Sequence, residues 1–339
     1  MKTLINKSTL TSMCDTVRAA TDTADLIELG VCGAGFISKL TGIGEGKYAW
    51  QRTDASGNVD FVTADDENKY PESGAGADGY AYNKIIPPPP CEIVSWADGT
   101  DEEIVAMVAA ADAGLINLAD YWSVGDTRSV PLSAMSATGV SESHDAQTVE
   151  FVLMHAGGYT LNTATEGGRT TCSFVVGMKN CLNTKGQMNS DITNSGSWEG
   201  STRRTWCNSV FYNAIPSTLR SIFKQFKVIT AEIYNGTTLQ TSVDYFTLSA
   251  EKEIFGDGYG FSGDGYSNNT EAASTQLFQY DWYKTASNRV KIVNGSASWW
   301  WERSPQYNNS KYFCRVSASG GANSYGATSK FGLAPVGCI

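Results

Sequence analysis

Two histidines and eight cysteines are the side chains of this sequence best suited to chemistry at neutral pH. His144 lies in the polar stretch S-E-S-H-D, and His155 ends a strand-like stretch just before two glycines. Neither histidine belongs to a nucleophile motif, and the G-x-S-x-G pattern of serine hydrolases is absent. The cysteines show no C-x-x-C spacing, so a zinc site has little support. We therefore expect no catalytic residues, no bound metal and no cofactor.

The cysteines are scattered along the chain rather than grouped. Our preferred interpretation is that they are free thiols, buried as small apolar side chains. A disulfide formed after the protein leaves the cell that makes it stays open as an alternative. A catalytic thiol would need a cation or a helix N-terminus to lower its pKa, and the sequence indicates no such environment. The cysteines concerned are Cys14, Cys32, Cys91, Cys172, Cys181, Cys207, Cys314 and Cys338.

The segment Gly256–Tyr266 contains the near-repeat G-D-G-Y, with carboxylates at Asp257 and Asp264. Two carboxylates on glycine-rich backbone could collect a calcium ion. Calcium prefers about six to eight oxygen ligands, however, and the spacing of an EF-hand is absent. We therefore interpret this segment as an insertion loop.

The balance of charges limits the classes of partner. Charged residues make up 18% of the chain, and the formal net charge is −10. Nucleic-acid binding depends largely on Lys and Arg that neutralise phosphates, so nucleic acid and anionic membranes are poor partner candidates. The sequence has no run of about 18 apolar residues to span a bilayer, and residues 1–20 lack the apolar core of a signal peptide. We expect synthesis in the cytoplasm of the host cell and no membrane insertion.

One amphipathic helix is predicted within residues 1–45. Leu10, Met13, Cys14 and Val17 have the spacing of a single apolar stripe. A single helix of this length cannot bury its stripe alone. We therefore expect this segment to act in attachment or oligomerisation, with packing on the rest of the chain as the alternative.

Residues 46–90 are predicted to form a small β module. Its strands are expected at 48–51, 59–62 and 80–82, with a hairpin turn at 54–58. Four consecutive prolines, Pro87–Pro90, then form a stiff extended spacer and mark a domain boundary.

Residues 91–339 are predicted to form one α+β domain. A helix should begin after Thr100, with Glu103 completing a capping box, and end at Gly114. Its buried face would hold Ile104, Met107, Val108 and Ala111.

A second helix should follow Pro216, because Leu219, Ile222, Phe223 and Phe226 form another apolar stripe. The strands of this domain are expected at 147–154, 243–248, 298–301, 312–317 and 331–334.

The tryptophan triplet at 299–301 has a structural and a functional interpretation. Neighbouring residues of a strand point to opposite faces, so at least one tryptophan should lie in the core. We expect Trp300 or Trp301 to be buried, with Trp299 as the surface candidate. Arg303 is expected to make a structural ion pair or to donate to loop carbonyls.

Several sequence blocks in order resemble an uncharacterised domain family common in phages and prophages of gut bacteria. The resemblance covers about residues 92–339. It rests on the W-W-W-E-R-S-P run at Trp299–Pro305, on Phe313 and Val316, and on the ending G-L-A-P-V at Gly332–Val336. Upstream blocks that fit the same pattern are Tyr121–Arg128, Trp206–Asn208 and Asp244–Ser249.

That family is similar to the formylglycine-generating branch of the C-type-lectin fold. The resemblance implies a C-type-lectin-like domain preceded by the small β module and the N-terminal helix. The same fold carries the variable proteins of diversity-generating retroelements, whose diversified C-terminal segments are rich in Asn, Tyr and Ser. Two segments here, 306–312 and 321–325, have that composition and position. The ligand-binding residues implied are Trp299, Gln306, Tyr307, Asn308, Asn309, Ser310, Tyr312, Asn323, Ser324 and Tyr325.

The expected function is that of a phage receptor-binding protein of the tail tip or tail fibre, located in the virion. Its partners would be a host-surface protein or glycan and other virion tail proteins, with self-association as a homotrimer. Aromatic side chains with few rotatable bonds and adaptable Ser, Gly and Asn suit such binding. The alternatives are a virion decoration protein that binds no ligand and an enzyme of the formylglycine-generating type.

Overall fold

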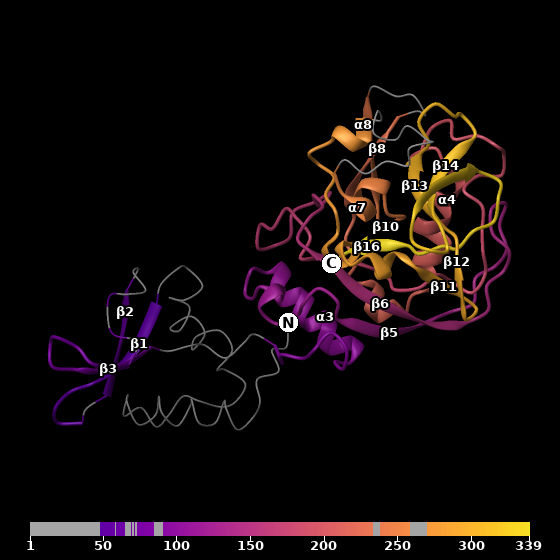
Figure 1. The fold of residues 1–339 in the computed structure, drawn as a ribbon. Helices are drawn as coiled ribbons and strands as arrows, with labels where there is room; N and C mark the ends of the chain where they lie inside the picture. The colour runs from indigo at the N-terminus through magenta and orange to yellow at the C-terminus, as the bar shows by residue number, and fades with distance from the viewer. Residues whose placement is uncertain are drawn as a thin grey trace. The chain divides into compact units, whose positions relative to one another are not determined.

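The computed structural model describes residues 48–84 except 58, 65–68, 70 and 72, together with 91–232, 238–257 and 270–339. The chain divides into two compact units, Met1–Cys91 and Glu92–Ile339 (Figure 1). The helix expected near Leu10 and most of the G-D-G-Y segment lie outside the described residues. Within the described residues, no helix has the length and apolar character needed to cross a bilayer.

The first unit contains a four-stranded antiparallel sheet in the order β2-β1-β4-β3. The predicted hairpin turn is confirmed, since the Gly57 amide donates to the Asp54 carbonyl at 3.0 Å and the Gly57 φ is +86°. The three predicted strands are present, and the additional strand β3 was missed because its S-G-A sequence has no apolar alternation. The strands are β1 (Tyr48–Thr53), β2 (Val59–Ala64), β3 (Ser73–Ala75) and β4 (Ala81–Lys84).

The first helix of the second unit, α3 (Asp101–Asp112), confirms its prediction residue by residue. The Thr100 side chain accepts from the Glu103 amide at 3.2 Å, and the Glu103 carboxylate accepts from the Thr100 amide at 2.7 Å. Gly114 follows the helix with a φ of +74°, a backbone conformation that glycine adopts at low cost. The predicted apolar face is buried.

Replacing Thr100 by alanine should lower the free energy of unfolding by about 1 kcal/mol, because the Glu103 amide loses its acceptor at the helix start. Urea unfolding of the full chain, followed by tryptophan fluorescence, measures this. Thr163→Ala is the matched control, since Thr163 is exposed and should change stability by less than about 0.5 kcal/mol. Equal stability of the two variants would contradict the prediction.

A five-stranded antiparallel sheet, in the order β10-β16-β7-β6-β5, organises the second unit. The predicted strand at 147–154 is confirmed as β6, and both its faces are buried over Phe151–Met154. The five strands are β5 (Thr127–Leu132), β6 (Gln147–Ala156), β7 (Phe174–Met178), β10 (Phe246–Thr247) and β16 (Val336–Cys338).

The strand predicted at 331–334 is wrong. Phe331 and Gly332 form only isolated bridges, and the strand β16 begins at Val336. Pro335 has no amide hydrogen to donate to a ladder, so regular pairing starts after it. Gly332 packs closely, and a Cβ there would lie 2.6 Å from the Cys181 Sγ.

The second predicted helix is also corrected. It ends after one turn at Arg220, and Phe226 begins a strand, β8 (Phe226–Ala231), paired with β9 (Leu239–Asp244). The four apolar side chains of the supposed stripe are all buried. The apolar pattern therefore indicated which residues are buried, but it did not indicate a helix. The strand expected at 243–248 breaks at Tyr245, because the Asn208 Oδ1 accepts from the amides of Tyr245 and Phe246.

The other helical segments within the described residues are short, and three of them run on continuously from residue 202 to residue 214. They are η1 (Leu118–Asp120), α4 (Thr202–Trp206), η2 (Cys207–Phe211), α5 (Tyr212–Ala214), α6 (Ser217–Arg220), α7 (Glu251–Phe255), α8 (Thr270–Ala273), α9 (Asp281–Lys284) and η4 (Ala286–Arg289). Helices and antiparallel sheets therefore coexist in the described chain, and the α+β class is confirmed.

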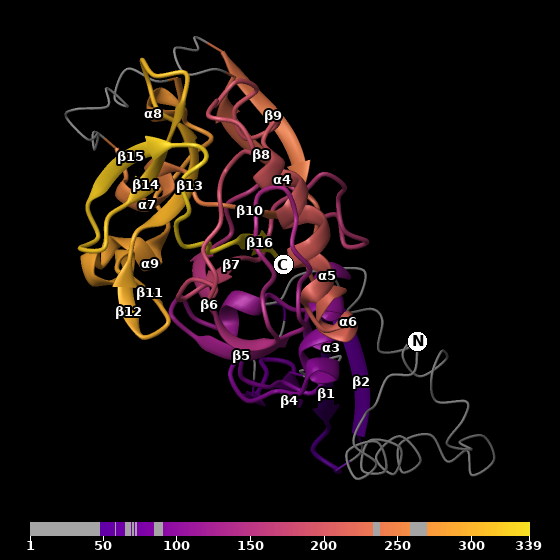
Figure 2. The same cartoon turned by 90° about the vertical axis from the view of Figure 1, so that its right-hand side faces the viewer.

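A three-stranded antiparallel sheet, in the order β13-β14-β15, is formed by a late part of the sequence, residues 300–326 (Figure 2). The strand predicted at 298–301 is split, because the hairpin strand β12 ends at Ser298 and β13 begins at Trp300. Trp300 and Trp301 are both buried, where burial of one of the two was expected, and Trp299 is partly exposed. The strands are β11 (Lys291–Val293), β12 (Ser296–Ser298), β13 (Trp300–Pro305), β14 (Tyr312–Val316) and β15 (Ala322–Gly326).

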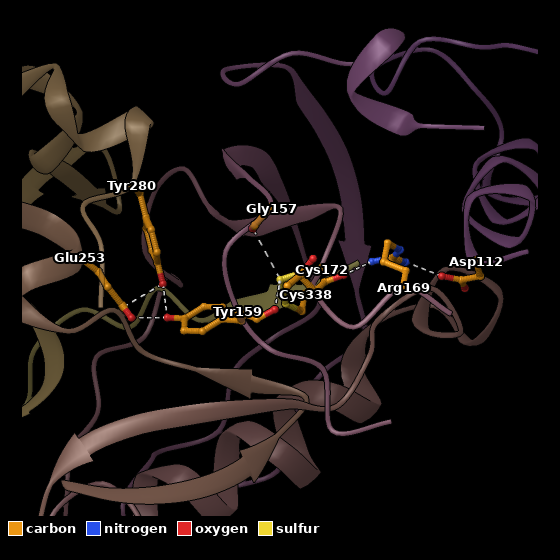
Figure 3. Close-up of a disulfide and its surroundings, with 9 residues drawn as sticks. Asp112, Gly157, Tyr159, Arg169, Cys172, Glu253, Tyr280 and Cys338 are labelled. Carbon is orange, nitrogen blue, oxygen red and sulfur yellow. Dashed lines mark hydrogen bonds and ion pairs between the residues drawn. A yellow bond between two sulfur atoms is a disulfide. The ribbon is translucent and has the colours of Figure 1, made fainter. Parts of the chain in front are cut away.

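A disulfide joins Cys172 to Cys338, across 166 residues of sequence (Figure 3). The interpretation of these two cysteines as free thiols is therefore wrong. The pairing is nonlocal, because the loop before β7 lies against the residues of β16, and the Ser173 amide donates to the Ile339 carbonyl at 2.6 Å. Cys181 and Cys207 are free thiols and buried, as predicted, and Cys314 is buried as well.

Candidate functional site

The W-W-W-E-R-S-P block builds the frame behind the candidate site. Arg303 and Glu253 are fully buried and form a bidentate ion pair, with both nitrogen–oxygen distances at 2.6 Å. Arg303 also donates to the carbonyls of Leu248 and Ile229, at 2.8 and 3.2 Å. The predicted structural role of Arg303 is confirmed.

Two tyrosines extend this buried pair into a network. The Tyr280 hydroxyl donates to the Glu253 carboxylate at 2.8 Å, and Tyr159 bonds to both groups (Figure 3). Burial raises the pKa of Tyr159 and of Tyr280 well above the usual range, so both hydroxyls keep their protons. The network therefore joins β13, through Arg303, to Glu253 of α7 and to the two tyrosines.

Three aromatic rings surround one guanidinium at the three-stranded sheet, and a fourth ring stacks on one of the three. We call Trp299, Tyr312, Tyr325 and Phe331, with the enclosed Arg315, the aromatic face. The guanidinium carbon of Arg315 lies 4.0 Å from the ring centroid of Trp299, 4.4 Å from that of Tyr325 and 4.2 Å from that of Phe331. These are cation–π distances.

The rings also contact one another. Tyr312 and Tyr325 stack with their centroids 6.0 Å apart and their planes 19° apart, and Tyr325 meets Phe331 edge-on at 5.6 Å. Tyr325 is 47% exposed, while the other three rings are partly exposed. The result is an aromatic surface that is held in place and still reaches solvent.

The register of β14 and β15 explains why Arg315 sits at the centre. Arg315 lies directly opposite Asn323, and Tyr325 is two residues further along the same side of β15. The Asn323 Oδ1 accepts from the Nε and Nη2 of Arg315, at 3.2 and 3.1 Å. Burial lowers the pKa of Arg315 to about 10, against an opposing effect of Tyr325, so the guanidinium is still charged at neutral pH.

The predicted ligand-binding residues fall into three groups. Trp299, Tyr312, Asn323 and Tyr325 come together at the aromatic face. A turn between β13 and β14 carries Tyr307, Asn308, Asn309 and Ser310, with a φ of +65° at Asn308. Ser324 is partly exposed on β15. Gln306 is buried, and its backbone N–H donates to the Tyr312 carbonyl.

Sequence reasoning missed Arg315, Phe331 and Ile192. Ile192 is 52% exposed, and its Cδ1 lies 3.3 Å from where a Cβ on Gly326 would sit, next to Tyr312. The alternation of Phe313 and Arg315 along β14 was the signal available for Arg315. Nothing local to Ile192 connects it to residues more than a hundred positions away.

The histidines do not form a catalytic pair. His144 is buried, its Nε2 lies 3.2 Å from the Ser141 hydroxyl, and burial lowers its pKa to about 4, with the Arg203 charge adding to the effect. His155 instead lies 2.9 Å from an Asp281 carboxylate oxygen and stacks on Phe278. The two imidazoles thus have separate surroundings.

A polar groove of about 200 Å³ lies beside β6 and the β11–β12 hairpin. Gln147, Glu150, Asn180, Cys181 and Asn294 are among the residues that line it. Burial raises the pKa of Cys181 to about 12, although nearby Lys291 opposes the shift, so the thiol is protonated at neutral pH. A protonated thiol is a poor nucleophile.

Three buried side chains could together coordinate a cation. The ligand atoms of Glu251, Glu302 and Cys314 lie within 4.8 Å of one another. Carboxylates and a thiol are acceptable metal ligands, yet buried acidic groups also occur in proteins without metal. Their arrangement assigns no function.

The comparisons with known proteins identify one domain family. Residues 174–339, just under half of the chain, match the model of a domain of unknown function, DUF6273. Searches of curated proteins and of solved structures returned no match. The matching segment contains β7, β16, the buried Arg303–Glu253 pair and the whole aromatic face.

Proposed function

We propose that this protein is a receptor-binding protein of a phage tail tip or tail fibre. Its C-terminal unit would be a C-type-lectin-like head that binds a host-surface ligand without catalysis. The resemblance of the W-W-W-E-R-S-P run and its neighbouring blocks to a phage and prophage domain family supports this proposal. The observation that carries it is the aromatic face, with Tyr325 47% exposed over the Arg315 guanidinium.

The physical reason lies in the cost of ordering a binding surface. Aromatic side chains offer large contact areas with few torsions to freeze. Here Arg315 and the ring stacking hold those torsions before any ligand arrives. Sites built on rigid elements with supported side chains bind with less loss of entropy.

The proposed sequence variability of the segments 306–312 and 321–325 is compatible with this supported site. The first segment includes the turn between β13 and β14, and the second includes most of β15. Substitutions at exposed positions such as Asn308 and Ser310 would alter the surface while the Arg303–Glu253 pair keeps the strands in place. The N-terminal 45 residues would attach the protein to other tail proteins and support a homotrimer.

The test is binding of the full chain to a panel of gut bacterial cells. We expect at least one strain to bind, and the variant with Tyr307, Tyr312 and Tyr325 changed to alanine to bind at least tenfold less. Circular dichroism verifies that the variant is folded. Tyr121→Ala is the matched control, because Tyr121 is 44% exposed and is not part of the aromatic face.

Two results would contradict the proposal. One is cell binding that the triple substitution leaves unchanged. The other is no binding to any strain, with the chain instead associating with purified virion proteins, which would favour a structural decoration role.

A further inference from the structure

The aromatic face holds a positive charge that no carboxylate of the described chain neutralises. Arg315 forms no ion pair among the described residues, and its hydrogen-bond partner Asn323 is neutral. Arg315 is buried, with 8% of its surface exposed, and its Nη1 donates to no group of the described chain. One edge of the guanidinium therefore retains unused capacity for hydrogen bonds.

A second cation, Lys311, directly precedes Tyr312 of the aromatic face in the sequence. Lys311 is exposed, and its carbonyl accepts from the Ala327 amide at 2.9 Å, directly after β15. Within the described residues Lys311 makes no ion pair either, and Asp191, the carboxylate next to Ile192, pairs with neither cation. Arg315 at the centre of the aromatic face and Lys311 next to Tyr312 are thus two cations without a carboxylate partner among the described residues, in a chain whose net charge is −10.

The aromatic face carries positive charge although the whole chain is negative, and this local charge favours an anionic ligand. A planar guanidinium binds carboxylates through parallel N–H donors and keeps its charge at neutral pH. A charge held in a partly desolvated, aromatic surrounding interacts more strongly with an opposite charge than it would in water. The surrounding rings meanwhile offer flat apolar surface beside the charge.

We infer that the ligand of the aromatic face is an acidic glycan, with a sugar carboxylate on the Arg315 and Lys311 side and a sugar ring against Tyr325. This inference rests on the proposed receptor-binding function and adds the class of ligand to it. An isolated anion would bind the cation but leave the aromatic rings exposed to solvent. A sugar acid can place its carboxylate at the cation and its ring on the aromatic surface, so we expect a sugar acid rather than an isolated anion.

The experiment measures binding of the full chain to two immobilised probes, 3′-sialyllactose and hyaluronan oligosaccharides. Each probe is compared with its own carboxyl-reduced form, in which the carboxylate has become a hydroxymethyl group. We expect binding to at least one acidic probe, at least tenfold weaker binding to its reduced form, and a loss of affinity as salt rises from about 50 to 200 mM.

Two charge substitutions locate the effect. Lys311→Gln should weaken binding of the acidic probe about threefold or more, and Arg315→Lys should weaken it further because the planar donor edge is lost. Lys284→Gln removes the same charge from an exposed lysine paired with Asp281, and its binding should equal that of the unmodified chain. Circular dichroism verifies the fold of each variant.

The outcomes separate this inference from the proposed function. Equal binding to the acidic and reduced probes, or no binding to either, overturns the acidic-glycan inference. If bacterial cells still bind through the three tyrosines in that case, the receptor-binding function stands. Loss of cell binding after protease treatment, with no effect of glycosidases, would assign the ligand to protein and also overturn the inference.

Discussion

Replacing Glu253 by alanine should lower the free energy of unfolding by about 3–5 kcal/mol, the largest loss expected from any single substitution discussed for this protein. The reason is that Arg303 is fully buried and would keep a charge without its bidentate partner. The Ala250 amide and the Tyr280 hydroxyl would also lose an acceptor. Both effects leave buried donors unsatisfied, which costs more than the net value of the bonds.

Chemical unfolding of the full chain provides the measurement. All tryptophans except Trp50 lie in the unit Glu92–Ile339, so fluorescence reports mainly on that unit. Lys330→Ala is the control, because it breaks only the exposed Lys330–Glu142 pair and should leave the stability almost unchanged. A similar small cost for Glu253→Ala would show that the buried network contributes little.

Opening the disulfide should be the second large effect. The Cys172–Cys338 bond closes a loop of 166 residues, and a cross-link across so long a loop restricts the unfolded chain strongly. We expect the Cys172→Ala, Cys338→Ala double variant to lose about 2–5 kcal/mol of stability. Because the bond links the loop before β7 to β16, the loss should be confined to the unit Glu92–Ile339.

Unfolding in the presence of a reductant tests whether the loss of stability comes from the disulfide itself. Dithiothreitol should destabilise the unmodified chain and leave the double variant unchanged, while mass spectrometry of unreduced peptides shows the 172–338 link directly. Cys91→Ser is the control, since Cys91 is a free and partly exposed thiol whose replacement should preserve the response to reductant. A chain that melts identically with and without reductant would contradict a stabilising disulfide.

The elements that could be predicted from sequence are those whose signals are local. The helix α3 was predicted to its caps because Thr100, Glu103 and Gly114 act within a few residues of one another. The hairpin at Asp54–Gly57 follows from the same kind of signal. The burial of at least one of Trp300 and Trp301 also followed from neighbouring residues alone, although both are buried.

The parts that could not be predicted depend on pairings between distant segments. Phe226 has the spacing of a helical stripe, yet its pairing opposite Asp244 makes it a strand residue. Nothing in the sequence around Cys172 or Cys338 indicates that these two cysteines form a disulfide. The candidate site shows the same limit, because Tyr325 and Trp299 were identified by residue type, whereas Arg315 became visible only once β14 had been paired with β15.

The position of β16 has a consequence for the order of events during synthesis. This strand lies between β10 and β7 in the sheet, although it is made about 90 residues after the first and about 160 after the second. A nascent chain that has not yet extended past residue 338 therefore leaves both neighbours with an open edge, and open edges invite pairing with other chains. The unit should fold in one late event, and fragments shortened before residue 336 should aggregate rather than persist as smaller folded heads.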